Sequence, residues 1–166
     1  MALADDFDVL LDSVKTDYHS GRYQQALASL RKAEENVLEA RVALLNASIP
    51  DTISGWQPVE VVNEYEEVGL AGSAHKRFIQ GEKKVDFIVG PDQPLLTATL
   101  NLHAKSGEKV KGIPANVFYD ANQKQGQVGL NPSPSLIVVV KGEGVSRQEL
   151  LDLAANLKME ILSNFK

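Results

Sequence analysis

The sequence predicts an α+β protein in which an N-terminal antiparallel helical hairpin is followed by a mostly antiparallel β-sheet with a C-terminal helix packed on it. Residues 1–49 have helical apolar periodicity, with no proline before Pro50 and a single glycine, Gly21. Short alternating runs between turn residues come next, and the C-terminal residues return to helical spacing. This order of elements favours α+β over alternating βαβ units. We expect residues 1–49 to form the hairpin and residues 50–166 the sheet domain, within one continuous structural unit.

The first helix is predicted by Phe7, Leu11, Val14 and Tyr18, which recur in steps of four and three. Acidic residues in its first turn complement the helix dipole. The helix should end near Gly21, because glycine readily adopts the left-handed conformation of a helix terminus.

A second apolar stripe predicts a longer helix after Gly21. Its members alternate in steps of three and four over three heptads, as in a coiled-coil seam, and every second member is alanine. The short link makes the two helices antiparallel, so the last turns of the second helix must pack on something other than the first. Pro50 ends this helix, because a residue before proline is disfavoured in the α conformation. The stripe consists of Tyr23, Ala26, Leu30, Ala33, Val37, Ala40 and Leu44.

A two-residue turn at Gly81-Glu82 predicts a β-hairpin, since glycine at the first loop position suits a type II′ turn. The register places Phe78 opposite Val85 on an apolar face and Arg77 opposite Asp86 on a charged face. One apolar and one charged face are typical of a half-buried antiparallel sheet.

Residues 136–140 are five apolar residues in a row, which predicts a central strand covered on both faces. Segments 59–68 and 94–103 fit either a strand or a helix. The remaining predicted strands are 109–113, 115–120 and 127–130, with Pro114 interrupting the first two and the third pairing back.

The C-terminal helix has the strongest local signal. Ser146 and Glu149 match the S-x-x-E capping box, in which each residue satisfies a backbone N–H of the first turn. We expect the helix to pack on the sheet. The apolar residues at helical spacing are Leu150, Leu153, Ala154, Leu157 and Ile161.

Composition disfavours several classes of function. The 17 Lys and Arg residues are scattered and the net charge is −5, so we expect no nucleic-acid binding. No apolar run has the length of a membrane span. The absence of cysteine suits an envelope protein, and the first residues, Met1 to Asp6, resemble those that follow a signal-peptide cleavage site. We therefore expect a periplasmic or secreted location.

The motifs of known catalytic and cofactor sites do not occur in the sequence, which predicts no catalytic residues, no cofactor and no metal. No histidine has the spacing of a zinc hydrolase. A metal could be held only if His75 and His103 lay on neighbouring strands near Asp86, and partly exposed histidines are the favoured interpretation.

Several segments together resemble an uncharacterised family of small bacterial secreted or periplasmic proteins. They are the hairpin, the link from Ile49-Pro50 to Ser54-Gly55-Trp56, the pair Arg77-Phe78, and the turn from Gly142 to Leu150. The sheet with its terminal helix is similar to the Mog1/PsbP-type fold. The resemblance implies a secreted location and supplies no catalytic residues.

The sequence favours a non-enzymatic envelope protein that acts as a binding or accessory module. Another protein would bind the hairpin at positions such as Val37, Ala40 and Leu44, which are exposed unless the sheet covers them. The alternative is a carrier that holds a small apolar ligand in a cleft between the sheet and the C-terminal helix. Phe78, Val85 and Phe87 would line that cleft. An enzyme is the third alternative, since a site can be assembled from scattered residues.

Overall fold

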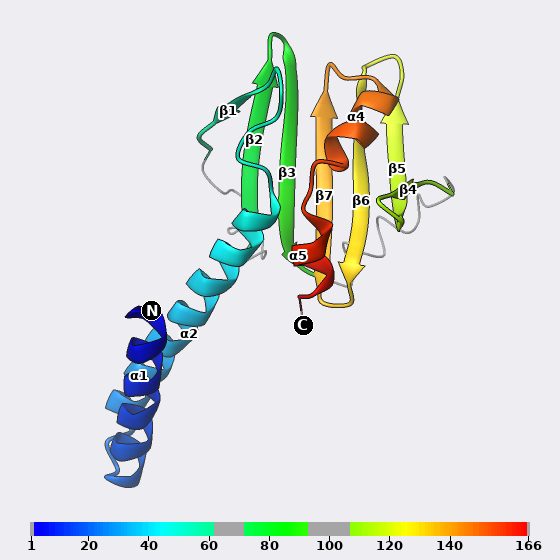
Figure 1. The fold of residues 1–166 in the computed structure, drawn as a ribbon. Helices are drawn as coiled ribbons and strands as arrows, with labels where there is room; N and C mark the ends of the chain where they lie inside the picture. Colours follow the sequence, from blue (N-terminus) through cyan, green and yellow to red (C-terminus); the bar gives the residue numbers. More distant parts are fainter. Residues whose placement is uncertain (1, 62–71, 93–106, 166) are drawn as a thin grey trace. The chain divides into compact units, whose positions relative to one another are not determined.

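The computed structural model describes residues 2–61, 72–92 and 107–165, and the chain forms two compact units, Met1–Arg41 and Val42–Lys166 (Figure 1). The boundary lies within the second helix, before the predicted one at residue 49. Leu45 in the last turn of this helix and Ile49 just after it are fully buried in the core of the second unit. The last turns of the helix therefore pack with the sheet, as the unequal helix lengths predict.

The first unit contains the predicted helical hairpin. Helix α1 (Ala2–His19) and helix α2 (Tyr23–Ser48) are joined by a short turn. Gly21 in this turn has a φ of +73°, a conformation that glycine adopts without steric cost. The prediction of both helix ends is confirmed.

The seam between the helices differs from the prediction. Ala26 and Ala33 are 4% exposed, whereas Tyr23, Leu30 and Val37 from the same predicted stripe are 59%, 45% and 52% exposed. At 3.6 residues per turn, steps of three and four residues place alternate members of the stripe about 40–60° apart around the helix, so they form two neighbouring rows. Ala26 and Ala33 are buried, whereas Ala40 and the large members of the stripe are exposed.

The second unit is built on a sheet of seven described strands in the order β1-β2-β3-β7-β6-β5-β4, with every neighbouring pair antiparallel. Helices α4 and α5 cover one face of this sheet (Figure 1). The strands are β1 (Gln57–Val59), β2 (Ala74–Gln80), β3 (Lys83–Pro91), β4 (Lys109–Val110), β5 (Ile113–Asp120), β6 (Gln125–Ser133) and β7 (Leu136–Glu143).

The hairpin of β2 and β3 has the predicted register. Phe78 pairs with Val85, and Arg77 pairs with Asp86. Gly81 in the turn has a φ of +59°, as the first position of a type II′ turn requires. Strand β7 occupies the centre of the sheet, which confirms the prediction from the apolar run 136–140.

Pro114 does not interrupt a strand as predicted. It lies inside β5 and pairs with Lys109, while the chain reverses at Lys111 and Gly112, which both have positive φ. Strand β6 pairs back on β5 as predicted, and is longer than expected. The segments predicted as either strand or helix, 59–68 and 94–103, lie outside the described residues except for residues 59–61, and β1 ends at Val59.

The C-terminal helix begins as predicted and then divides. Both hydrogen bonds of the capping box between Ser146 and Glu149 are present at the start of α4 (Arg147–Ala154). A separate short helix, α5 (Met159–Ser163), follows. Between them the N–H of Lys158 donates to the carbonyl of Ser48 at 2.9 Å, which replaces the bond that a continuous helix would make.

Candidate functional site

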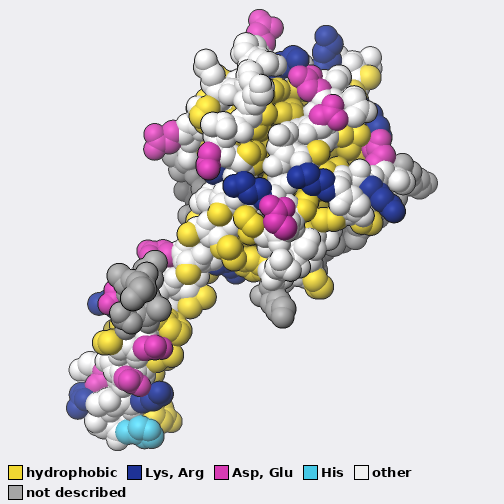
Figure 2. Space-filling model, viewed as in Figure 1, with side chains coloured by type: hydrophobic (Ala, Val, Ile, Leu, Met, Phe, Trp, Pro, Cys, Tyr) yellow, Lys and Arg dark blue, Asp and Glu magenta, His cyan; other side chains and the backbone are white. Residues whose placement is uncertain are grey.

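The exposed apolar side chains of the chain are concentrated on the helical hairpin. Among residues whose side chains are described, seven of the nine exposed large hydrophobic residues belong to α1 or α2. Figure 2 shows hydrophobic side chains along these helices, among charged ones. The seven are Val9, Tyr18, Tyr23, Leu27, Leu30, Val37 and Leu44.

Four of these residues form a surface that we call the α2 stripe: Tyr23, Leu27, Leu30 and Val37. They follow one another in steps of four, three and seven, so they share one side of the helix. The stripe lies beside the buried alanines of the seam. The helix thus has two adjacent apolar rows. The row that contains Ala26 and Ala33 is buried at these two residues, and the α2 stripe is exposed.

The three residues predicted as a partner surface are all exposed. Val37 is 52% and Leu44 is 46% exposed, and Ala40 is also exposed. Leu27, at 49%, is a further exposed residue that the predicted stripe did not contain. Its position four residues after Tyr23 and three before Leu30 was the signal available in the sequence.

The residues predicted to line an apolar cleft are core residues. Phe78, Val85 and Phe87 each have 0% exposure, and the two phenylalanine rings pack edge to face with centroids 5.7 Å apart. These side chains are fully enclosed by the protein, so they do not line a cleft. This packing disfavours the ligand-carrier alternative.

The face of the sheet opposite α4, which we call the second face, carries polar and charged side chains. Side chains alternate between the faces of a strand, and a Cβ added to Gly142 would lie 2.5 Å from Val145 and 2.9 Å from Leu150. Gly142 therefore faces α4, and its neighbours Lys141 and Glu143 face the opposite side. The strand register then aligns a row of side chains across the second face, which consists of Arg77, Asp86, Lys141, Gln127 and Phe118.

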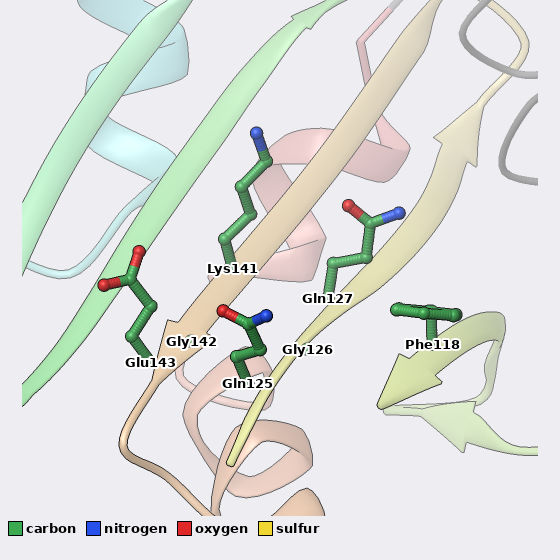
Figure 3. Close-up of a pocket in the computed structure, with 7 residues that line it drawn as sticks. All are labelled: Phe118, Gln125, Gly126, Gln127, Lys141, Gly142 and Glu143. Atoms are coloured by element: carbon green, nitrogen blue, oxygen red, sulfur yellow. The ribbon is translucent and has the colours of Figure 1, made fainter. Parts of the chain in front are cut away.

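A shallow hollow of about 360 Å³ lies on this second face (Figure 3). Phe118 is 50% exposed at one side of it. Glu143, at the other side, is paired with Lys84 at 2.8 Å. The hollow is lined by Phe118, Gln125, Gly126, Gln127, Lys141, Gly142 and Glu143.

Sequence reasoning did not single out this hollow. The alternation of Ala115 and Val117 with Asn116 and Phe118 indicates an exposed aromatic ring on β5. The hollow itself depends on the pairing of β5, β6 and β7, which residue spacing does not reveal.

A charged cluster lies further along the same row. Nε2 of His75 lies 2.7 Å from Oδ1 of Asp86, and Nε of Arg77 donates to the same oxygen at 2.7 Å. Burial raises the pKa of Asp86, but the hydrogen bonds and charges of His75 and Arg77 outweigh it and hold the pKa below its usual value. The carboxylate is thus ionised and hydrogen-bonded to two side chains, which is typical of an ion pair that stabilises a fold.

Of the three residues considered as metal ligands, His75 and Asp86 lie side by side, and His103 lies outside the described residues. Within the described part of the chain, no three His, Cys, Asp or Glu side chains are arranged to hold a metal ion. The described helices also include none with the apolar length of a bilayer span.

Comparison of the chain with models of known families, with curated proteins and with solved structures finds no match.

Proposed function

We propose that the protein is a non-enzymatic binding or accessory module of the bacterial envelope, and that it binds another protein through its helical hairpin. The observation behind this proposal is the α2 stripe. Soluble proteins expose single apolar residues freely, but contiguous apolar surfaces with polar borders are typical of protein interfaces. Tyr23, Leu27 and Leu30 follow one another on one side of α2 and form such a surface, and Val37 lies two turns further along the same side.

The spacing of the stripe indicates the partner's shape. Anchors in steps of three, four and seven residues are how helices recognise one another, because each side chain then meets the same side of the partner. We therefore propose that the partner contributes an amphipathic helix. Tyr23 is suited to anchor it, since tyrosine is enriched among the residues that contribute most of the binding energy of protein interfaces.

The proposed envelope location has independent support. The chain has no cysteine, so oxidising conditions cannot mispair it. The resemblance of its segments to secreted bacterial proteins favours the same compartment. Fractionation of the native cells tests this part of the proposal, and recovery of the protein only with cytosolic markers would contradict it.

Site-specific photocrosslinking in the native cells tests the binding surface. A photoreactive residue in place of Leu30 should crosslink to one partner protein, whereas the same residue at Gln25, on the opposite side of α2, should not. The double variant Leu27→Glu/Leu30→Glu should abolish the complex. The matched control Gln25→Glu/Ala28→Glu adds the same charge at exposed positions and should preserve it.

Two results would contradict the proposed interface. Equal crosslinking from Leu30 and Gln25 would show that contact is not specific to the stripe. Crosslinks only between copies of this chain, with a concentration-dependent mass in solution, would replace the partner protein with a second copy.

A further inference from the structure

The hollow on the second face of the sheet has the chemistry of a small-ligand site that is independent of the hairpin. Its volume of about 360 Å³ lies at the lower end of the usual range for ligand sites, roughly 300–1,000 Å³. Phe118, Gln127 and Lys141 come from three neighbouring strands, β5, β6 and β7. The sheet therefore fixes the backbone positions from which these side chains extend, so that binding does not have to order the backbone.

The apolar component of the hollow is one aromatic ring. Phe118 is half exposed, although large aromatic side chains usually gain stability from burial. Its place at the edge of the hollow in Figure 3 offers a flat apolar surface to a ligand. A ligand with one apolar face would cover this ring.

The polar component consists mainly of amides. Gln125 and Gln127 line the hollow, and an amide both donates and accepts hydrogen bonds. No described residue hydrogen-bonds to the side chain of Gln127. Hydroxyl groups also donate and accept, so they match amides whichever way the amide is oriented.

The charges around the hollow are balanced. The two charged residues that line it, Lys141 and Glu143, have opposite signs, and Glu143 is also paired with Lys84 at 2.8 Å. A site of this kind has no excess charge with which to select a phosphate or a metal cation. The chemistry favours a neutral ligand.

We propose that this hollow binds a neutral saccharide, with the apolar face of a sugar ring on Phe118 and its hydroxyl groups on Gln127 and Gln125. A pyranose ring presents an apolar face of C–H groups and an edge of hydroxyl groups, which is the combination that the hollow complements. A peptide strand would instead bind at a sheet edge, where backbone donors and acceptors are available.

Isothermal titration calorimetry of the full chain with chitohexaose, maltohexaose and cellohexaose tests the proposal, with heparin as a polyanion. At least one neutral oligosaccharide should bind with a Kd in the range of about 10 µM to 1 mM. Phe118→Ala and Gln127→Ala should each weaken that binding about tenfold or more. The control Val59→Ala removes an exposed apolar side chain at the far end of the same face and should leave the Kd unchanged.

Thermal melts show whether each variant is folded. If a variant is not folded, the binding site is mapped instead on the parent protein, from the changes in backbone amide chemical shifts on addition of the oligosaccharide. Shifts on β5, β6 and β7 are expected. The proposal would be overturned if none of the three oligosaccharides bound with a Kd below about 10 mM. It would also be overturned by tighter binding of heparin, or by a Kd that Phe118→Ala does not change.

Discussion

At the scale of single residues, Asp86 should make stability depend on pH. Its folded pKa is held below the unfolded value of about 3.9, so its contribution is present above that value and is lost as the pH falls through the folded pKa. Asp86→Asn should lower the free energy of unfolding by about 1.5–3 kcal/mol at pH 7, because it weakens the bonds to His75 and Arg77. The difference between the variant and the parent should shrink below about pH 4. Urea unfolding of the variant and the parent at several pH values measures this difference in the free energy of unfolding.

The control for this prediction is Glu82→Gln, which changes an exposed carboxylate in a turn. It should change stability by no more than about 0.5 kcal/mol at any pH. A constant difference between Asp86→Asn and the parent from neutral to acid pH would show that the carboxylate's charge is not what stabilises the cluster.

At the scale of elements, the seam of the hairpin predicts that a small residue is required at Ala33. Ala33 is 4% exposed, so Ala33→Leu should overpack the seam and destabilise the hairpin by about 1–3 kcal/mol. Leu30→Ala, three residues away but exposed, should change stability by no more than about 0.5 kcal/mol. Thermal melts followed at a helical wavelength compare the two. Equal effects of both substitutions would be evidence against the observed seam.

The start of α4 provides a second prediction at this scale. Ser146→Ala removes the side-chain acceptor for the N–H of Glu149 and should cost about 0.5–2 kcal/mol. Leu153→Ala leaves a cavity beneath the helix and should cost more, about 2–5 kcal/mol. Denaturant unfolding of both variants tests the order of these losses. The reverse order would mean that α4 is held mainly by its cap.

The elements that the sequence predicts correctly have local causes. The turn at Gly81 and the capping box at Ser146 depend on residues within a few positions, which the sequence displays directly. The division of the C-terminal helix depends on a bond from Lys158 to the distant Ser48, which no local pattern contains.

The candidate surfaces also differ in whether the sequence alone could predict them. The exposure of Val37 was predicted, but its cause differs: Val37 lies beside the buried alanines of the seam, and not beyond the end of α1. The burial of Phe78 and Phe87 against each other could not be distinguished from a cleft, since an apolar sheet face fits both. The hollow beside Phe118 depends on long-range strand pairing and was not predicted.

At the scale of the whole molecule, the core of the sheet unit is independent of the first helix and most of the second. The described core residues begin at Leu45 and continue to Leu162. We therefore expect a protein that lacks residues 1–41 to fold and to unfold cooperatively. Circular dichroism melts and dispersed amide spectra measure this. A truncated chain without a cooperative transition would show that the hairpin is required for the core to form.

The short strand β1 limits how these molecules can assemble. It consists of three exposed residues at one end of the described sheet, and its central residue, Pro58, has no N–H to donate. An incoming strand from another molecule would find no continuous row of partners there. Loss of residues 57–59 would uncover the seven-residue strand β2 as a template for polymerisation. We therefore expect Pro58 to disfavour edge-to-edge pairing of sheets through β1.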